Sequence, residues 1–138
     1  MDIQPYLFFN GRCEEAIDFY KQALGAKVGV MMRYEDSPTP HQPGMVPDGW
    51  ESKIMHAEMK IDDGVLLVSD GSGRETQGFH GFHLTLRVKD VAEADKRYAA
   101  LAAGGQPKMP LMETFFSPRF GMLTDRFGVG WIILVERK

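Results

Sequence analysis

The stretch GFHLTLRVKDVAEADKRYAALAAGG, residues 81–105, has the pattern that opens a structural unit. An alternating strand is followed by Asp90 as a helix cap, an amphipathic helix and a glycine stop. The stretch QPYLFFNGRCEEAIDFYKQALG, residues 4–25, has the same order of signals, with Asn10 as the expected cap. One order of signals used twice in one chain predicts an internal duplication.

The two copies superpose with a single offset. Tyr20 falls on Tyr98, because 98 − 20 = 78, and the same offset places Pro5 on His83. Three strand-like segments then follow each helix, at 28–34, 53–61 and 64–70 in the first half and at 109–116, 118–125 and 129–136 in the second.

The order strand, helix and three strands, used twice, predicts an α+β fold made of two tandem βαβββ modules. We expect the two modules to form a single domain. The first module covers about residues 1–70, the linker about 71–80 and the second module about 81–138.

Composition excludes several classes of function. The 16 Lys and Arg residues and 19 Asp and Glu residues give a net charge of −3, without the basic patch that nucleic-acid binding needs. No apolar run approaches the roughly 20 residues of a membrane span, and the first residues do not resemble a signal peptide. The lone Cys13 predicts a reducing compartment, and we expect a cytoplasmic protein.

Polar side chains alternate with apolar ones on two predicted strands. In residues 83–88, Leu84, Leu86 and Val88 form one face, and His83, Thr85 and Arg87 form the other. In residues 53–61, the polar face carries His56, Glu58 and Lys60. We expect the apolar faces to lie under the helices and the polar faces to line a cleft between two curved sheets.

The duplicated unit resembles the vicinal oxygen chelate superfamily of glyoxalases, extradiol dioxygenases, fosfomycin-resistance proteins and bleomycin-binding proteins. Residues 5–26, 53–61, 109–131 and the second helix are similar to its PhnB-like branch. Some members of that branch are labelled ubiquinone-pathway methyltransferases. This sequence has no glycine-rich nucleotide loop after a strand, so that activity is not expected here. The resemblance also implies a cupped eight-stranded mixed sheet with both helices on its outer face, and a homodimer.

The resemblance further implies a metal site, with ligands from the first and last strand of each half. The matching positions are Pro5, Val68, His83 and Ile132, of which only His83 can ligate a metal. We therefore expect no metal and no other cofactor. A relocated site for zinc, nickel, manganese or iron is the alternative.

Two functions remain open. In the first, the cleft binds a small, partly apolar molecule without chemistry, through His83, Thr85, Arg87, Phe9, Leu7, Phe116 and Arg119. In the second, the protein is a lyase or isomerase in which Glu58 is the general base, with His56 or His83. A purely structural role for His56 and Glu58, and a function that resides in the dimer itself, are further readings.

Overall fold

The computed structural model describes residues 1–38, 46–73 and 78–137. The chain divides into two compact units, Met1–Gln77 and Gly78–Lys138, which are called unit 1 and unit 2 and are described separately. The division falls inside the segment predicted as a linker. Residues 39–45, in the proline-rich segment DSPTPHQPGMVPDGWE (36–51) of the first half, lie outside the described residues.

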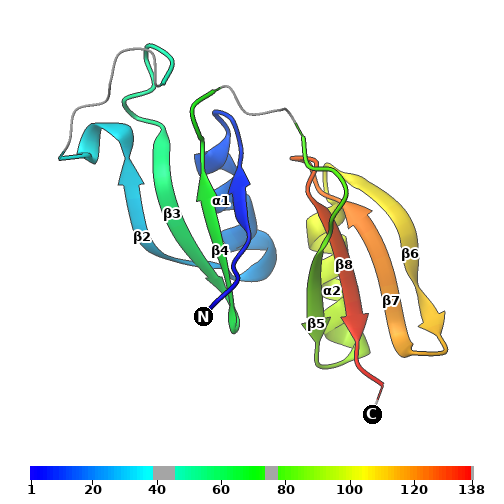
Figure 1. The fold of residues 1–138 in the computed structure, drawn as a ribbon. Helices are drawn as coiled ribbons and strands as arrows, with labels where there is room; N and C mark the ends of the chain where they lie inside the picture. Colours follow the sequence, from blue (N-terminus) through cyan, green and yellow to red (C-terminus); the bar gives the residue numbers. More distant parts are fainter. Residues whose placement is uncertain (39–45, 74–77, 138) are drawn as a thin grey trace. The chain divides into compact units, whose positions relative to one another are not determined.

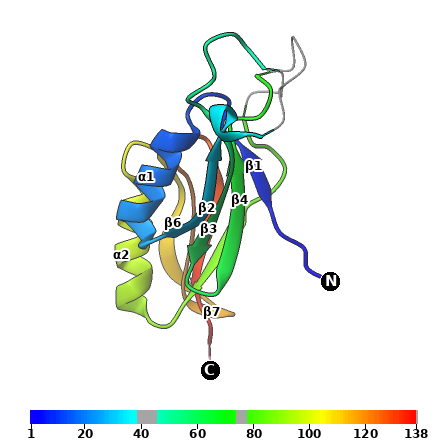
Figure 2. The same cartoon turned by 90° about the vertical axis from the view of Figure 1, so that its left-hand side faces the viewer.

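Unit 1 is a mixed four-stranded sheet with one helix. The sheet order is β1-β4-β3-β2, with β1 parallel to β4 and the other pairs antiparallel (Figure 1). Helix α1 lies on one side of this sheet (Figure 2). The elements are β1 (Tyr6–Phe8), α1 (Cys13–Leu24), β2 (Lys27–Arg33), a short 3-10 helix (Tyr34–Asp36), β3 (Ile54–Ile61) and β4 (Gly64–Ser69).

Unit 2 repeats this arrangement. Its sheet order is β5-β8-β7-β6, with β5 parallel to β8 and the other pairs antiparallel (Figure 1). The elements are β5 (Leu84–Val88), α2 (Val91–Ala102), β6 (Gln106–Thr114), β7 (Ser117–Thr124) and β8 (Gly130–Val135). The predicted α+β class and the two βαβββ modules are confirmed, and the eight strands lie in two four-stranded sheets.

The two helices begin differently. Asp90 caps α2 as predicted, because its Oδ1 accepts a hydrogen bond from the Glu93 amide at 2.8 Å. The prediction that Asn10 caps α1 was wrong. The N-cap is Arg12, which makes no side-chain cap bond, and the buried carboxylate of Asp70, just after β4, accepts from the amides of Gly11 and Cys13 at 2.7 and 2.8 Å.

The core of each unit lies between its sheet and its helix. In unit 1, Leu7 pairs with Val68, which pairs with Ala57, and all three are buried. In unit 2, Leu86 pairs with Ile133, which pairs with Gly121. The alternation of the strands then places Leu84, Leu86 and Val88 on the helix-covered face, where they were predicted to lie.

These registers correct the offset between the copies. Leu86 corresponds to Leu7, so the first strands differ by 86 − 7 = 79, whereas the helices differ by 91 − 13 = 78. Unit 1 therefore has one extra residue between strand and helix. The residue that corresponds to His83 is Gln4, because 83 − 4 = 79, and not Pro5.

Candidate functional site

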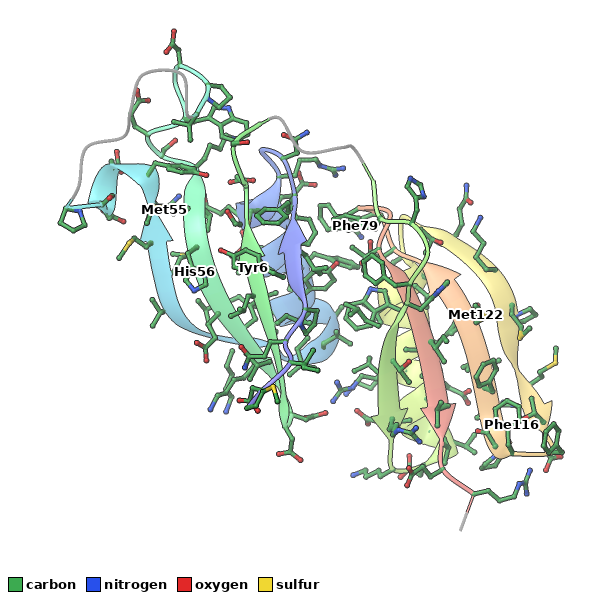
Figure 3. All side chains as sticks on the ribbon, viewed as in Figure 1. Tyr6, Met55, His56, Phe79, Phe116 and Met122 are labelled. Atoms are coloured by element: carbon green, nitrogen blue, oxygen red, sulfur yellow. The ribbon has the colours of Figure 1, made fainter. Side chains whose placement is uncertain are left out.

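The face of each sheet that lies opposite its helix is called here the open face. In unit 1 this face carries Tyr6 and Phe8 from β1, His56 and Glu58 from β3, and Leu67 from β4. Figure 3 shows Tyr6 and His56 side by side on it. A residue pair in direct register shares one side of a sheet, and Tyr6, Leu67 and Glu58 form one such row.

Tyr6 connects two strands of the open face of unit 1. Its hydroxyl lies 2.8 Å from His56 Nδ1, a hydrogen-bond distance. Partial burial raises the pKa of the Tyr6 phenol above its usual value of 10.0, so the hydroxyl stays protonated at neutral pH. The ring of Tyr6 also stacks on that of Phe8, with centroids 5.0 Å apart and planes at 18°.

Glu58 supplies a carboxylate beside this group. It is half-buried, two residues from His56 on the same strand face, and it makes no hydrogen bond or ion pair among the described residues. Such a carboxylate is able to accept a proton or a hydrogen bond from a ligand.

The open face of unit 2 is apolar. Thr85, Ile132, Met122 and Met109 form one row across four strands, and Arg87, Leu134, Phe120 and Met112 form the next. Phe116, in the turn after β6, extends the second row, since its ring meets that of Phe120 edge-on at 5.1 Å. Figure 3 shows Met122 and Phe116 within unit 2.

Four predicted site residues of unit 2 border or extend this apolar face. Thr85 and Arg87 lie at its β5 edge, and Arg87 Nη1 forms an exposed ion pair with Glu136 at 2.8 Å. The exposed His83 ring lies over Gly130, where an added Cβ would be 2.7 Å from its Cδ2. Phe116, the fourth, is half-exposed. Whether these residues bind a ligand stays a prediction.

Three other predicted substrate-binding residues are corrected. Leu7 and Phe9 are buried on the helix-covered face, and the Phe9 ring lies 6.3 Å from that of Tyr20 in α1. The offset of 78 had misplaced their strand by one residue, which exchanges the two faces. Arg119 directs its guanidinium to the helix side, where Nε pairs with Asp95 Oδ1 of α2 at 3.1 Å.

Sequence reasoning missed Tyr6 and Phe8, which occupy the open face instead. The signal was present, since Tyr6, Phe8 and Gln4 alternate with buried Leu7 and Phe9. The predicted grouping of His56 and Glu58 with His83 joins residues of different units and stays a prediction.

The positions that the resemblance gave to metal ligands are poorly suited to a metal. Val68 is buried under α1, and its neighbour Leu67 holds the position on the open face. When Gln4 takes the place of Pro5 and Leu67 that of Val68, the four ligand positions are Gln4, Leu67, His83 and Ile132. Together they offer one imidazole and one amide as metal ligands. Within the described residues, no three His, Cys, Asp or Glu side chains come together in a way that could hold a metal ion.

The described part of the chain contains no helix that is both long and apolar enough to span a membrane.

Several known proteins are similar to this chain. Protein YjdN of Escherichia coli K12 is 33% identical over 143 residues, which cover 100% of this chain and 97% of that protein. Protein PA1353 from Pseudomonas aeruginosa is 40% identical in sequence to this chain. Its crystal structure matches with a TM-score of 0.86, over 100% of this chain and 99% of that chain.

A PhnB protein from Bacillus cereus, described as a 3-demethylubiquinone-9 3-methyltransferase, is 26% identical and has a TM-score of 0.78 over 98% and 99% of the chains. YjdN and this PhnB protein support the PhnB-like branch. The family model for the Glyoxalase/Bleomycin resistance protein/Dioxygenase superfamily matches residues 2–133, and the chain belongs to this superfamily.

Proposed function

We propose that the protein binds a small, partly apolar molecule on the open faces of its sheets, without the metal site of its superfamily. The observation that carries the proposal is the apolar open face of unit 2, where Phe120, Met122, Ile132 and Leu134 are half-buried. Contiguous apolar surface that the fold leaves uncovered often marks a binding site. Methionines at its edge suit a ligand of variable shape, because their side chains adapt.

Fluorescence of 8-anilinonaphthalene-1-sulfonate, an apolar dye, tests the proposal. We expect saturable binding that Met122→Gln weakens by about tenfold, since the change removes apolar contact area at the centre of the face. Val91→Ser is the matched control, because Val91 is an exposed apolar residue on α2 of the same unit. Dye binding that neither variant changes would contradict the proposal.

Metal analysis tests the second part of the proposal. Purified protein is expected to carry far less than one equivalent of zinc, nickel, manganese or iron after mild chelation, with unchanged thermal stability. One tightly held equivalent that disappears in His83→Ala would show that the superfamily site has been kept in another form.

A second candidate is an isomerase or lyase in which Glu58 is the general base. The observation that favours it is the half-buried Glu58 carboxylate, which has no partner among the described residues and lies beside His56. Dihydroxyacetone in D2O offers a test, because a base that removes its α-proton causes deuterium incorporation visible by NMR.

If Glu58 is the base, Glu58→Gln is expected to lower the exchange rate by about 100-fold or more. The control is Lys60→Gln, two residues further along the same face. Deuterium incorporation that persists in Glu58→Gln would exclude this role. The methyltransferase description of the Bacillus cereus relative is not extended to this chain, because neither mixed sheet has the parallel topology of a doubly wound nucleotide fold.

A cytoplasmic homodimer is part of the proposal. The edge strands of the two sheets, β1 and β2 in unit 1 and β5 and β6 in unit 2, favour pairing with a second copy. Light scattering coupled to gel filtration is expected to give twice the mass of the 138-residue chain, and a monomer at micromolar concentration would contradict this.

A further inference from the structure

We propose that Tyr6, Phe8 and His56 form a subsite for a flat aromatic ring that carries a hydrogen-bond acceptor, such as an aromatic ketone. This inference rests on the proposed function and names the ligand class that the open face of unit 1 would take. The two rings would stack on the ligand, and the His56 imidazole would donate to its acceptor atom.

The rings of Tyr6 and Phe8 form a wall on the open face. They lie two residues apart on β1, and they stack on each other at 5.0 Å with an angle of 18°. Both are uncovered, since 40% of Tyr6 and 41% of Phe8 is exposed. Adjacent, nearly parallel and exposed rings provide an aromatic surface on which a third flat ring can pack by offset stacking.

His56 contributes a directed polar group at the edge of this wall. Its ring centroid lies 5.6 Å from that of Tyr6, and Nδ1 lies 2.8 Å from the Tyr6 hydroxyl. In the proposed subsite, the protonated phenol of Tyr6 donates to Nδ1. Nε2 then carries the imidazole proton and donates outward. The Tyr6 hydroxyl therefore sets both the tautomer and the orientation of His56.

Unit 2 has no counterpart of this group. The offset of 79 places Thr85 and Arg87 at the positions of Tyr6 and Phe8. The buried partners Ala57 and Gly121 give an offset of 121 − 57 = 64, which places Phe120 at the position of His56. A ligand of the proposed class would therefore bind to one subsite per chain.

The tautomer has a direct test that needs no ligand. Long-range proton–nitrogen NMR of the His56 ring is expected to show a protonated Nε2 and an unprotonated Nδ1 at pH 7.5. Tyr6→Phe keeps the ring and removes the hydroxyl, and is expected to give a mixture of the two tautomers. A protonated Nδ1 in the natural protein would overturn the inference.

Ligand class is tested with three probes of similar size. Amide spectra of β1 and β3 are followed during titration with acetophenone, cyclohexyl methyl ketone, which lacks the aromatic ring, and ethylbenzene, which lacks the acceptor. Acetophenone is expected to bind about fivefold more tightly than either, as ring stacking and one hydrogen bond each contribute about 1 kcal/mol. Equal binding of the two ketones would overturn the aromatic subsite.

Two variants complete the test. Phe8→Leu is expected to weaken acetophenone about fivefold and to leave cyclohexyl methyl ketone unchanged. Phe115→Leu, in the exposed turn after β6, is the control and is expected to change neither. A Phe8→Leu protein that changes from dimer to monomer would show that a second copy covers the wall, which also overturns the inference.

These outcomes separate the inference from the proposed function. Binding of 8-anilinonaphthalene-1-sulfonate to unit 2 without a preference for acetophenone in unit 1 would overturn only the inference. Failure of the dye and of all three probes would overturn both.

Discussion

Unit 1 and unit 2 have the same strand order and the same pattern of parallel and antiparallel pairs, yet their open faces differ in chemistry. Where unit 1 has Tyr6, Phe8 and His56, unit 2 has Thr85, Arg87 and Phe120. The helix sides differ too, since α1 buries five side chains and α2 buries two. The comparison shows that one βαβββ topology accommodates different side chains on both faces of its sheet.

Each unit has one fully buried aspartate, and its removal is the largest expected effect. Asp70 accepts from the amides of Gly11, Cys13 and Ile54. Asp125 accepts from the Phe127 and Val129 amides and from Trp131 Nε1.

Asp70→Ala and Asp125→Ala are each expected to lower the free energy of unfolding by about 3–5 kcal/mol, because three donors, two of them buried, lose their acceptor. Urea unfolding measures this, and Asp63→Ala in the exposed turn after β3 is the control. If only one of the two variants lost less than about 1 kcal/mol, the two aspartates would not stabilise their units equally.

The second prediction concerns Gly121 of unit 2, which corresponds to Ala57 of unit 1. A Cβ at Gly121 would lie 2.9 Å from Leu111 Cδ2 and 3.0 Å from both Tyr98 Cε2 and the Met109 carbonyl. Gly121→Ala is therefore expected to destabilise the protein by about 1–3 kcal/mol through overpacking. Thermal unfolding measures the effect, and an unchanged midpoint would mean that α2 moves freely on its sheet.

The third prediction compares the first residues of the two helices. Cys13 is fully buried at the start of α1, whereas Val91 at the start of α2 is 38% exposed. Burial raises the pKa of the Cys13 thiol above its usual value of 9.0. The native state therefore keeps the proton. The contribution of this thiol to stability is constant below about pH 9 and is lost as the pH rises further.

Urea unfolding between pH 7.5 and 10 is expected to show this fall in the natural protein and a smaller one in Cys13→Ala. In the double variant Cys13→Ala/Val91→Cys, the exposed thiol is expected to react with Ellman's reagent at pH 8 at least tenfold faster than the native Cys13. Equal reactivity would contradict the difference in burial.

The smallest effect is expected at the exposed ion pair of Arg87 and Glu136. Both side chains are more than half exposed, at 63% and 67%, so water and salt screen their attraction. Glu136→Gln is expected to change stability by less than about 1 kcal/mol, with no change in 1 M salt. A larger loss of stability would show that Arg87 supports the fold of unit 2, in contrast to Phe8 at the corresponding position of unit 1.

Much of the fold was predictable from local patterns. Asp90 caps α2 and Gly25 ends α1 in the left-handed conformation, as the sequence indicates, because these signals act on neighbouring residues. The capping of α1 by Asp70 was not predictable, since that carboxylate comes from the end of β4, far along the chain.

The faces of β1 were assigned wrongly for a similar reason. One extra residue before α1 leaves the helix pattern intact and exchanges the two sides of the strand. The alternating pattern of the sequence places His56, Glu58, Thr85 and Arg87 on open faces correctly. The contact between Tyr6 and His56 depends in addition on which residues of β1, β4 and β3 lie opposite one another, and this register is known only from the structure.

If the open faces are the ligand-binding surfaces, a bound ligand contacts the methionines that lie on them, and methionine methyl NMR tests this directly. Met109, Met112 and Met122 lie on the open face of unit 2. Met31 is paired with the buried Ala57, on the helix side of unit 1, yet it is as exposed as Met112, at 44% against 45%. Saturation with 8-anilinonaphthalene-1-sulfonate is expected to shift the three methyl signals of unit 2 and to leave Met31 unchanged. Shifts at Met31 without shifts at Met109, Met112 and Met122 would contradict it.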